Sequence, residues 1–233
     1  MRRSSSSTTG RLCLRAIFIL LEQLDLRGAI VTTDAMGTQT AIARQICSVG
    51  ADYISTLKAN HPTLAQDAHD WFKRHQHEAE EKAVHTTEFV CEAGHHRIEK
   101  RCFFSVPVDQ LFCPERIKQW TGVKTLIVEQ SSPKGYRFAY RQLWNKTTHS
   151  TRFFLSSLKP DFDGEARCFA SSLCNRHVAD FPHSIRSHWG VENQLHWCLD
   201  VVFDEDDSRI RQDHAPHNMT ILTHTSSQFA TPR

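Results

Sequence analysis

Asp34 is the first residue of this sequence whose type and position could do chemistry. It follows a short β-branched run, residues 28–33, that is typical of a buried strand. The carboxyl ends of strands are where open α/β sheets bind ligands. A carboxylate there costs free energy unless it is paired, hydrogen-bonded or bound to a metal. Asp34 is therefore a candidate site residue, and the alternative is an ordinary turn or cap residue.

A second candidate is a polar stripe on the helix predicted over residues 184–199. At 3.6 residues per turn, His188, Glu192 and His196 share one face of this helix. Three interpretations remain open from the spacing. The stripe could be a zinc or di-iron cluster, a hard-metal carboxylate beside phosphate-binding groups, or an ordinary polar face.

The third feature is a basic stretch. Residues 134–159 contain six Lys or Arg and no Asp or Glu. Within it, Arg137 and Arg141 alternate with aromatic residues, so a strand here would have one aromatic and one basic face. A basic face could bind phosphates in a salt-dependent way. The alternative is a half-buried strand whose outer face is merely solvated.

Two strands and two helices are predicted to position Asp34. Residues 28–34 and 51–58 read as strands, and residues 38–49 and 62–83 read as helices. This alternation predicts a parallel strand pair in an α/β layer. Residues 17–25 predict a preceding amphipathic helix, and residues 1–16 predict a disordered tail.

The middle of the chain predicts strands instead. Residues 84–159 are β-rich, with strand-like runs at residues 96–106, 123–129, 135–143 and 152–158 and a hairpin turn at residues 131–135. Helices are expected again over residues 163–180 and 184–199. Residues 223–233 are expected to form a frayed tail.

The composition excludes several classes of protein. With 233 residues, 39% hydrophobic and a net charge of +2, the chain is neither generally disordered nor strongly basic. Its eight Cys form no C-x-x-C pair and are expected to be buried, reduced thiols. No Gly-rich phosphate loop, nucleophile elbow, dinucleotide fingerprint or membrane-length apolar run is present.

Two long stretches resemble the insertion-sequence DDE transposases, in the branch that includes the H-repeat-associated proteins. They are GAIVTTDAMGTQTAIARQICSVGADYISTLKANHPTL, residues 28–64, and SIRSHWGVENQLHWCLDVVFDEDDSRIRQDHAPHNMTIL, residues 184–222. Weaker matches follow in the same order at residues 94–106, 120–130 and 151–159. The resemblance covers about residues 17–222, and residues 1–16 do not resemble the family.

This resemblance implies a ribonuclease-H-like catalytic core in which three carboxylates bind two Mg²⁺ ions. Asp34 in TTDAMG matches the second acid and Glu192 in HWGVEN matches the third, so both are expected to be catalytic and metal-binding. In related transposases a basic residue one turn before the catalytic Glu contacts DNA, and here that position is His188. The expected DNA-binding residues are Lys58, Arg137, Arg141, Lys159, Arg186 and His188.

The sequence departs from the family at its start, because no residue matches the first catalytic Asp. The acids before Gly28 are Glu22 and Asp25, both in the helix that leads into the Asp34 strand. The expected fold class is therefore α/β, a ribonuclease-H-like core truncated at the N-terminus, with a β-rich insertion between the second and third acidic residues. The partial core is expected over residues 17–83, the insertion over 84–159, and a helical return over 160–222.

The expected function is transposase-derived DNA strand cleavage and transfer, defective without the first Asp. The alternative is a catalytically inactive DNA-binding remnant that regulates a full-length transposase. Expected partners are transposon-end DNA and a second copy of the chain or a full-length transposase, with no membrane and a cytoplasmic, nucleoid-associated location. An unstable product and a His/Cys metalloprotein that binds zinc are the remaining possibilities.

Overall fold

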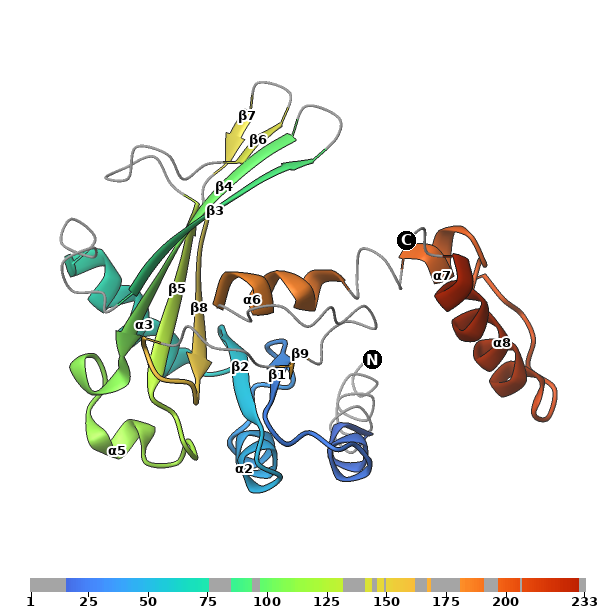
Figure 1. Ribbon diagram of the computed structural model, residues 1–233, viewed down its shortest axis with the longest axis horizontal. Coiled ribbons are helices and arrows are strands. Elements are labelled where there is room, and N and C mark those ends of the chain that lie inside the picture. The colour runs from blue at the N-terminus through green and yellow to red at the C-terminus, as the bar shows by residue number, and fades with distance from the viewer. Residues whose placement is uncertain are drawn as a thin grey trace, which may run out of the picture.

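One mixed β-sheet runs through the described part of the protein. The computed structural model describes residues 16–75, 85–93, 97–131, 141–143, 146–148, 150–161, 167–168, 181–190, 197–205 and 207–230. The described strands follow the order β7-β6-β4-β5-β8-β2-β1-β9, and β3 pairs with β4 (Figure 1). Their bounds are β1 Ala29–Thr33, β2 Asp52–Leu57, β3 His85–Ala93, β4 Arg97–Pro107, β5 Thr125–Ser131, β6 Arg141–Leu143, β7 Lys146–Thr148, β8 Ser150–Ser156 and β9 Arg167–Cys168.

Helices cover the sheet or lie beyond it. A first helix spans residues 16–23. The labelled helices are α2 Thr40–Ser48, α3 Pro62–His75, α5 Pro114–Ile117, α6 Phe181–Gly190, α7 Trp197–Val201 and α8 Ala215–Ala230, with a 3₁₀ turn at Val108–Gln110. Within the described ranges, no helix combines the length and the apolar character that a membrane span requires.

The predicted parallel pair is confirmed. β1 and β2 are parallel, with Ile30 opposite Asp52 and Thr33 opposite Ser55. The helix between them, α2, buries Ile42 and Ile46 against the sheet. Because the two strands are parallel, their carboxyl ends meet at the same edge of the sheet, and Asp34 and Lys58 both follow there.

The β-rich character of residues 84–159 is confirmed for the described strands, including β3, which the sequence did not predict as a separate strand. These strands extend the same sheet: β8 pairs antiparallel with β2, and β5 pairs with β8. A polar seam fixes the β2–β8 register. Ser157 Oγ donates to Asp52 Oδ1 at 2.6 Å and accepts from the Tyr53 N–H at 3.0 Å. The predicted hairpin turn at residues 131–135 lies outside the described residues after Ser131.

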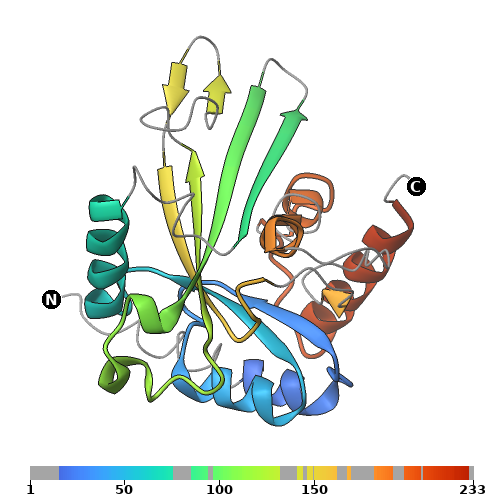
Figure 2. The same ribbon diagram turned by 60° about the vertical axis from the view of Figure 1, so that its left-hand side comes forward.

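Helices lie on both faces of the sheet (Figure 2), and each face has its own buried apolar cluster. On one face, α2 and α3 pack with the sheet in a large buried cluster that includes Ile46, Trp71 and Leu126. On the other face, α6 packs through Phe181 and Ile185 onto a second buried cluster. Its sheet members are Ile30, Ile54, Phe103, Ile127 and Phe154, and Leu158, two residues after β8, completes it. The result is a three-layer α/β arrangement around β1 and β2.

Two expectations for the C-terminal third require correction, and a third is tested only in part. The helix predicted over residues 163–180 is wrong at Arg167–Cys168, which form β9 and pair in parallel with Ala29 and Ile30 of β1. Backbone pairing with an open strand edge overrides the helical periodicity there. The helix predicted over 184–199 is confirmed up to Gly190 in α6 and from Trp197 in α7, and residues 191–196 lie outside the described residues. The expected frayed tail from residue 223 is helical up to Ala230, as part of α8.

Candidate functional site

Asp34 lies immediately after β1, and its side chain is exposed at the edge where β1 and β2 end. Its Oδ1 accepts a hydrogen bond from the Gly37 N–H at 2.8 Å. Asp34 therefore caps its own turn, as the alternative interpretation required. The same bond fixes the orientation of the carboxylate, and Asp34 remains exposed to solvent.

Gly37 is the residue that permits this tight turn. A Cβ added at Gly37 would lie 3.1 Å from Thr33 Cβ and 3.5 Å from Asp34 Oδ1. The first distance is closer than ordinary van der Waals contact, so a side chain here would push the loop away from the strand. The donor that orients Asp34 thus depends on glycine at this position.

Hydroxyl groups join the two strand ends beneath Asp34. Thr33 Oγ1 donates to Ser55 Oγ at 2.8 Å in a buried contact between β1 and β2. Thr38 Oγ1 lies 2.7 Å from the Asp34 carbonyl oxygen and 2.8 Å from the Thr56 carbonyl oxygen. The single hydroxyl hydrogen is shared between these two acceptors. The backbone at Asp34 is therefore tied to both strands.

α6 brings His188 to β1. Its Nδ1 lies 3.1 Å from Thr32 Oγ1, two residues before Asp34. The buried side chains of Phe181 and Ile185 fix the helix on this face of the sheet. A hydrogen bond thus connects His188, one of the candidate DNA-binding residues, to the Asp34 strand.

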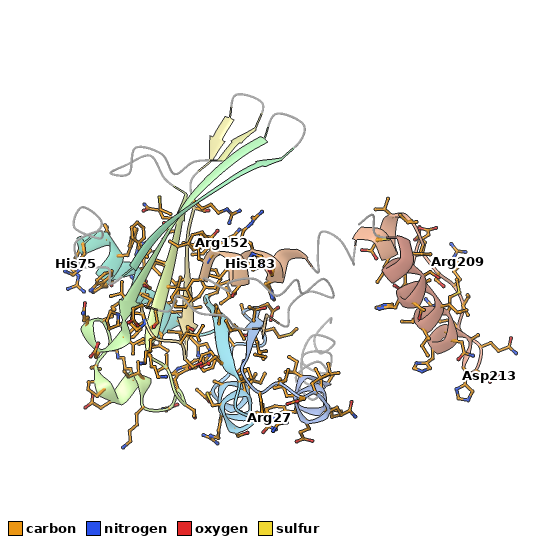
Figure 3. All side chains as sticks on the ribbon, viewed as in Figure 1. Arg27, His75, Arg152, His183, Arg209 and Asp213 are labelled. Atoms are coloured by element: carbon orange, nitrogen blue, oxygen red, sulfur yellow. The ribbon has the colours of Figure 1, made fainter. Side chains whose placement is uncertain are left out.

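The other candidates are distributed differently. Lys58 is exposed one residue after β2, at the same edge as Asp34. Arg186 is partly exposed on α6, two residues before His188. Figure 3 labels Arg152 on β8 and His183 on α6, in the region where the start of α6 lies against the sheet. Basic side chains thus lie on and beside α6 on this face of the sheet.

Lys159 lies toward the opposite edge. Because β8 is antiparallel to β2 and pairs Ser156 with Ile54, the residues after β8 lie where β2 begins. Asp34 lies where β1 and β2 end. The separation along the strands is roughly 17 Å, at about 3.3 Å per residue over five residues. A contact between Lys159 and DNA would therefore be remote from the Asp34 edge.

Three candidates fall partly or wholly outside the described residues. Glu192, Arg137 and the side chain of Arg141 are not described; the backbone of Arg141 pairs with Glu99 of β4. The structure thus brings Asp34, Lys58 and His188 to one region, and the predicted pair of Asp34 with Glu192 stays a prediction.

The sequence patterns did not indicate every residue that contacts the Asp34 loop. Asn60 and His61 precede α3 and contact the carbonyl groups of the loop after Asp34. The Asn-His-Pro motif at residues 60–62 predicts only the start of a helix. Glu129 of β5 is a buried acid that the sequence did not single out. Its side chain is 3% exposed and is ion-paired with Arg101, while Arg152 Nη1 lies 3.9 Å from Glu129 Oε2. Strand alternation alone could have placed these three charges on one face.

The described part of the site offers few donors for a divalent cation. Asp34 offers an exposed carboxylate whose Oδ1 is already oriented, which suits a ligand for Mg²⁺. Among the described residues, no group of three or more His, Cys, Asp or Glu is placed to hold a metal ion. Asp34 therefore fits as one ligand, and a complete site would need donors from elsewhere.

Comparison with known proteins identifies the family. The sequence profile described as "Transposase DDE domain" matches residues 3–227. This extends the resemblance beyond residues 17–222 and corrects the expectation that residues 1–16 are unlike the family. No solved structure matches the chain.

Relatives from Escherichia coli agree with this match. "Putative protein YbfL" and "H repeat-associated putative transposase YhhI", both from strain K12, are each 32% identical over 219 residues, covering 94% of this chain and 51% of each relative. "Putative transposase YncI" from strain O157:H7 is 32% identical over 205 residues, 87% of this chain and 45% of that protein. The chain thus spans about half the length of these relatives. It belongs to the DDE transposase family.

Proposed function

We propose that this chain provides part of a site for DNA strand cleavage and transfer by two-metal phosphoryl transfer, with Asp34 and Glu192 as metal ligands. The observation that carries this proposal is the position of Asp34, exposed at the end of β1. The Thr32–His188 contact supports it, because α6 is held beside this strand and Glu192 follows His188 by four residues. A ribonuclease-H-like core is the fold that the family implies.

The chemistry would come from Mg²⁺, which activates water or a DNA 3′-hydroxyl and stabilises the leaving oxygen when bound. The residues of the chain would hold the cations and orient the DNA phosphates. Asp34 would hold one cation through the carboxylate that Gly37 orients. Lys58 and Arg186 would contact phosphates near the scissile bond, where cationic side chains offset the phosphate charge.

We further propose that these 233 residues alone cleave DNA weakly or not at all. The acids before Gly28 are Glu22 and Asp25. The described helix over residues 16–23 contains Glu22, and Asp25 follows it, so neither lies on a strand beside β1. With two of the three carboxylates expected in the family, at least one cation would be held poorly.

A divalent-metal nicking assay on transposon-end DNA tests this function, with Mg²⁺ and Mn²⁺ titrated separately. We expect trace cleavage or none, and no difference between the wild-type chain and Glu192→Ala. Strong cleavage that disappears in Glu192→Ala would show that the proposed inactivity is wrong and that a site with two carboxylates is sufficient. Strong cleavage that survives both Glu192→Ala and Asp34→Asn would instead refute the assigned ligands.

A second candidate function is DNA binding without catalysis, as a regulator of a full-length transposase. It is favoured by residues 134–159, with six basic and no acidic residues, and by the partly exposed Arg152 within it. Phosphate contacts release counterions, so the affinity for duplex DNA should fall steeply with salt. Arg137→Ala and Arg141→Ala should each weaken binding and reduce the salt dependence. Absent or salt-independent binding would dismiss this function.

A further inference from the structure

The loop that follows Asp34 is held by hydrogen bonds from two residues that immediately precede α3. We propose that Asn60 and His61 are positioning residues for Asp34, which fix the loop of residues 35–38 so that the carboxylate keeps its direction for metal binding. The metal-binding part rests on the function proposed above. The contacts themselves are independent of it.

Both side chains donate to backbone carbonyl groups of that loop. Asn60 Nδ2 donates to the carbonyl oxygen of Ala35 and lies 3.4 Å from that of Thr38. His61 Nε2 lies 2.7 Å from the Thr38 carbonyl oxygen. These two carbonyl groups bracket Gly37, whose N–H binds Asp34 Oδ1. A shift of either carbonyl would therefore move the donor that orients the carboxylate.

The chemistry of the His61 contact is fixed by its partner. A carbonyl oxygen can only accept a hydrogen bond, so His61 Nε2 must carry the proton. This holds for the neutral Nε2–H tautomer and for the charged ring. The role of His61 is thus that of a donor, and an amide side chain of similar reach can replace it.

His61 is itself held firmly on three sides. Its backbone N–H donates to the Lys58 carbonyl oxygen at 3.0 Å, and its own carbonyl accepts from the Ala65 N–H at 2.9 Å in the first turn of α3. The ring packs edge-on against Trp120, with centroids 5.0 Å apart and an interplanar angle of 73°. Trp120 is 5% exposed and belongs to the segment between α5 and β5. The donor is therefore rigidly placed before any ligand binds.

Four variants of the full chain separate donation from bulk. His61→Leu keeps apolar volume against Trp120 but removes the donor, whereas His61→Gln keeps an N–H donor. Asn60→Asp replaces the donor with an acceptor of the same shape, facing two carbonyl oxygens. Asp34→Asn is the reference for metal binding. Tm of each variant without metal shows whether it folds.

Two readouts are used. Hydrogen exchange reports the amide protons of residues 35–38, with β2 as the internal reference, and electron paramagnetic resonance reports Mn²⁺ bound to the full chain. We expect His61→Leu and Asn60→Asp to speed exchange in the loop about five- to tenfold, the factor for losing one net hydrogen bond, with β2 unchanged. We expect the same variants to weaken Asp34-dependent Mn²⁺ binding about fivefold, and His61→Gln to restore both.

The outcomes distinguish this proposal from the proposed function. Unchanged loop exchange in both His61→Leu and Asn60→Asp overturns the positioning contact. Faster exchange with unaltered Asp34-dependent Mn²⁺ affinity overturns the positioning role. If the wild-type chain binds no Mn²⁺ through Asp34, the proposed metal function fails and the positioning role fails with it. Faster loop exchange in that case would show that the contact still exists.

Discussion

Replacing Ile185 with alanine should loosen the contact between α6 and the sheet. Ile185 is 2% exposed and lies in the cluster with Ile30, Ile54 and Phe154. α6 also carries His188, whose contact with Thr32 holds the helix beside β1. The variant therefore tests whether this helix is packed where the site needs it.

The magnitude follows from the atoms removed. Alanine lacks three carbon atoms of the isoleucine side chain, which at about 0.8 kcal/mol each gives roughly 2.4 kcal/mol of lost transfer free energy. A site that collapses only in part adds a cavity contribution, so the free energy of unfolding should fall by about 3–4 kcal/mol. For a chain of this size, that corresponds to a decrease in Tm of roughly 6–16 °C.

The neighbouring Ser184 is the matched control. It is fully buried at 0% exposure, and its Oγ has no hydrogen-bond partner among the residues that the structure describes. Because the hydroxyl was desolvated without compensation, Ser184→Ala should leave stability unchanged or raise it by about 1 kcal/mol. Urea unfolding followed by circular dichroism measures both variants. A loss below about 1 kcal/mol in Ile185→Ala, or equal losses in both, would refute the packing of α6 on the sheet.

Three further changes have defined expected results. Arg101→Ala leaves the buried Glu129 carboxylate without its close partner and should lower the free energy of unfolding by about 3–5 kcal/mol. The double variant Arg101→Ala with Glu129→Leu should recover most of this loss. A double variant as unstable as Arg101→Ala would contradict the prediction. Burial raises the pKa of Tyr53 above its usual value. The stabilisation by the un-ionised Tyr53 side chain is therefore fully present below the unfolded pKa of about 10, and it is lost as pH rises through the folded pKa. The urea concentration at the unfolding midpoint should therefore decrease as pH is raised above about 10, and it should decrease less in Tyr53→Phe. Gly122 has φ +69°, and a Cβ there would lie 3.2 Å from Cys47 Sγ, so Gly122→Ala should lower Tm through a loss of about 1–3 kcal/mol.

The layer around Asp34 was predictable because its signals are local. A β-branched run that ends in Asp34, a helical period over α2 and a second run over β2 are each contained in about ten residues. The way in which β8 joins β2 was not predictable from such patterns. It depends on pairing between residues such as Ser156 and Ile54, about 100 positions apart, and on the buried bond from Ser157 to Asp52.

The short strand β9 also could not be predicted from local sequence patterns, which here favour a helix. Residues 163–180 have a helical spacing of apolar side chains, yet Arg167 and Cys168 pair with the edge of β1. An edge strand presents unpaired N–H and C=O groups, and a segment that satisfies them gains more than helical propensity offers. Local periodicity contains no information about that open edge.

The site itself combines one predictable residue with supports that are distant in sequence. His188 contacts Thr32 across 156 positions, and His61 contacts Thr38 across 23 positions. The first contact comes from the face of the sheet that α6 covers, and the second comes from the start of α3 at the strand ends. Both end within four residues of Asp34, so neither helix can shift without acting on the segment that holds the carboxylate. The direction of Asp34 is therefore a property of the packed layers on both sides of β1, and a sequence pattern can identify the acid without identifying what orients it.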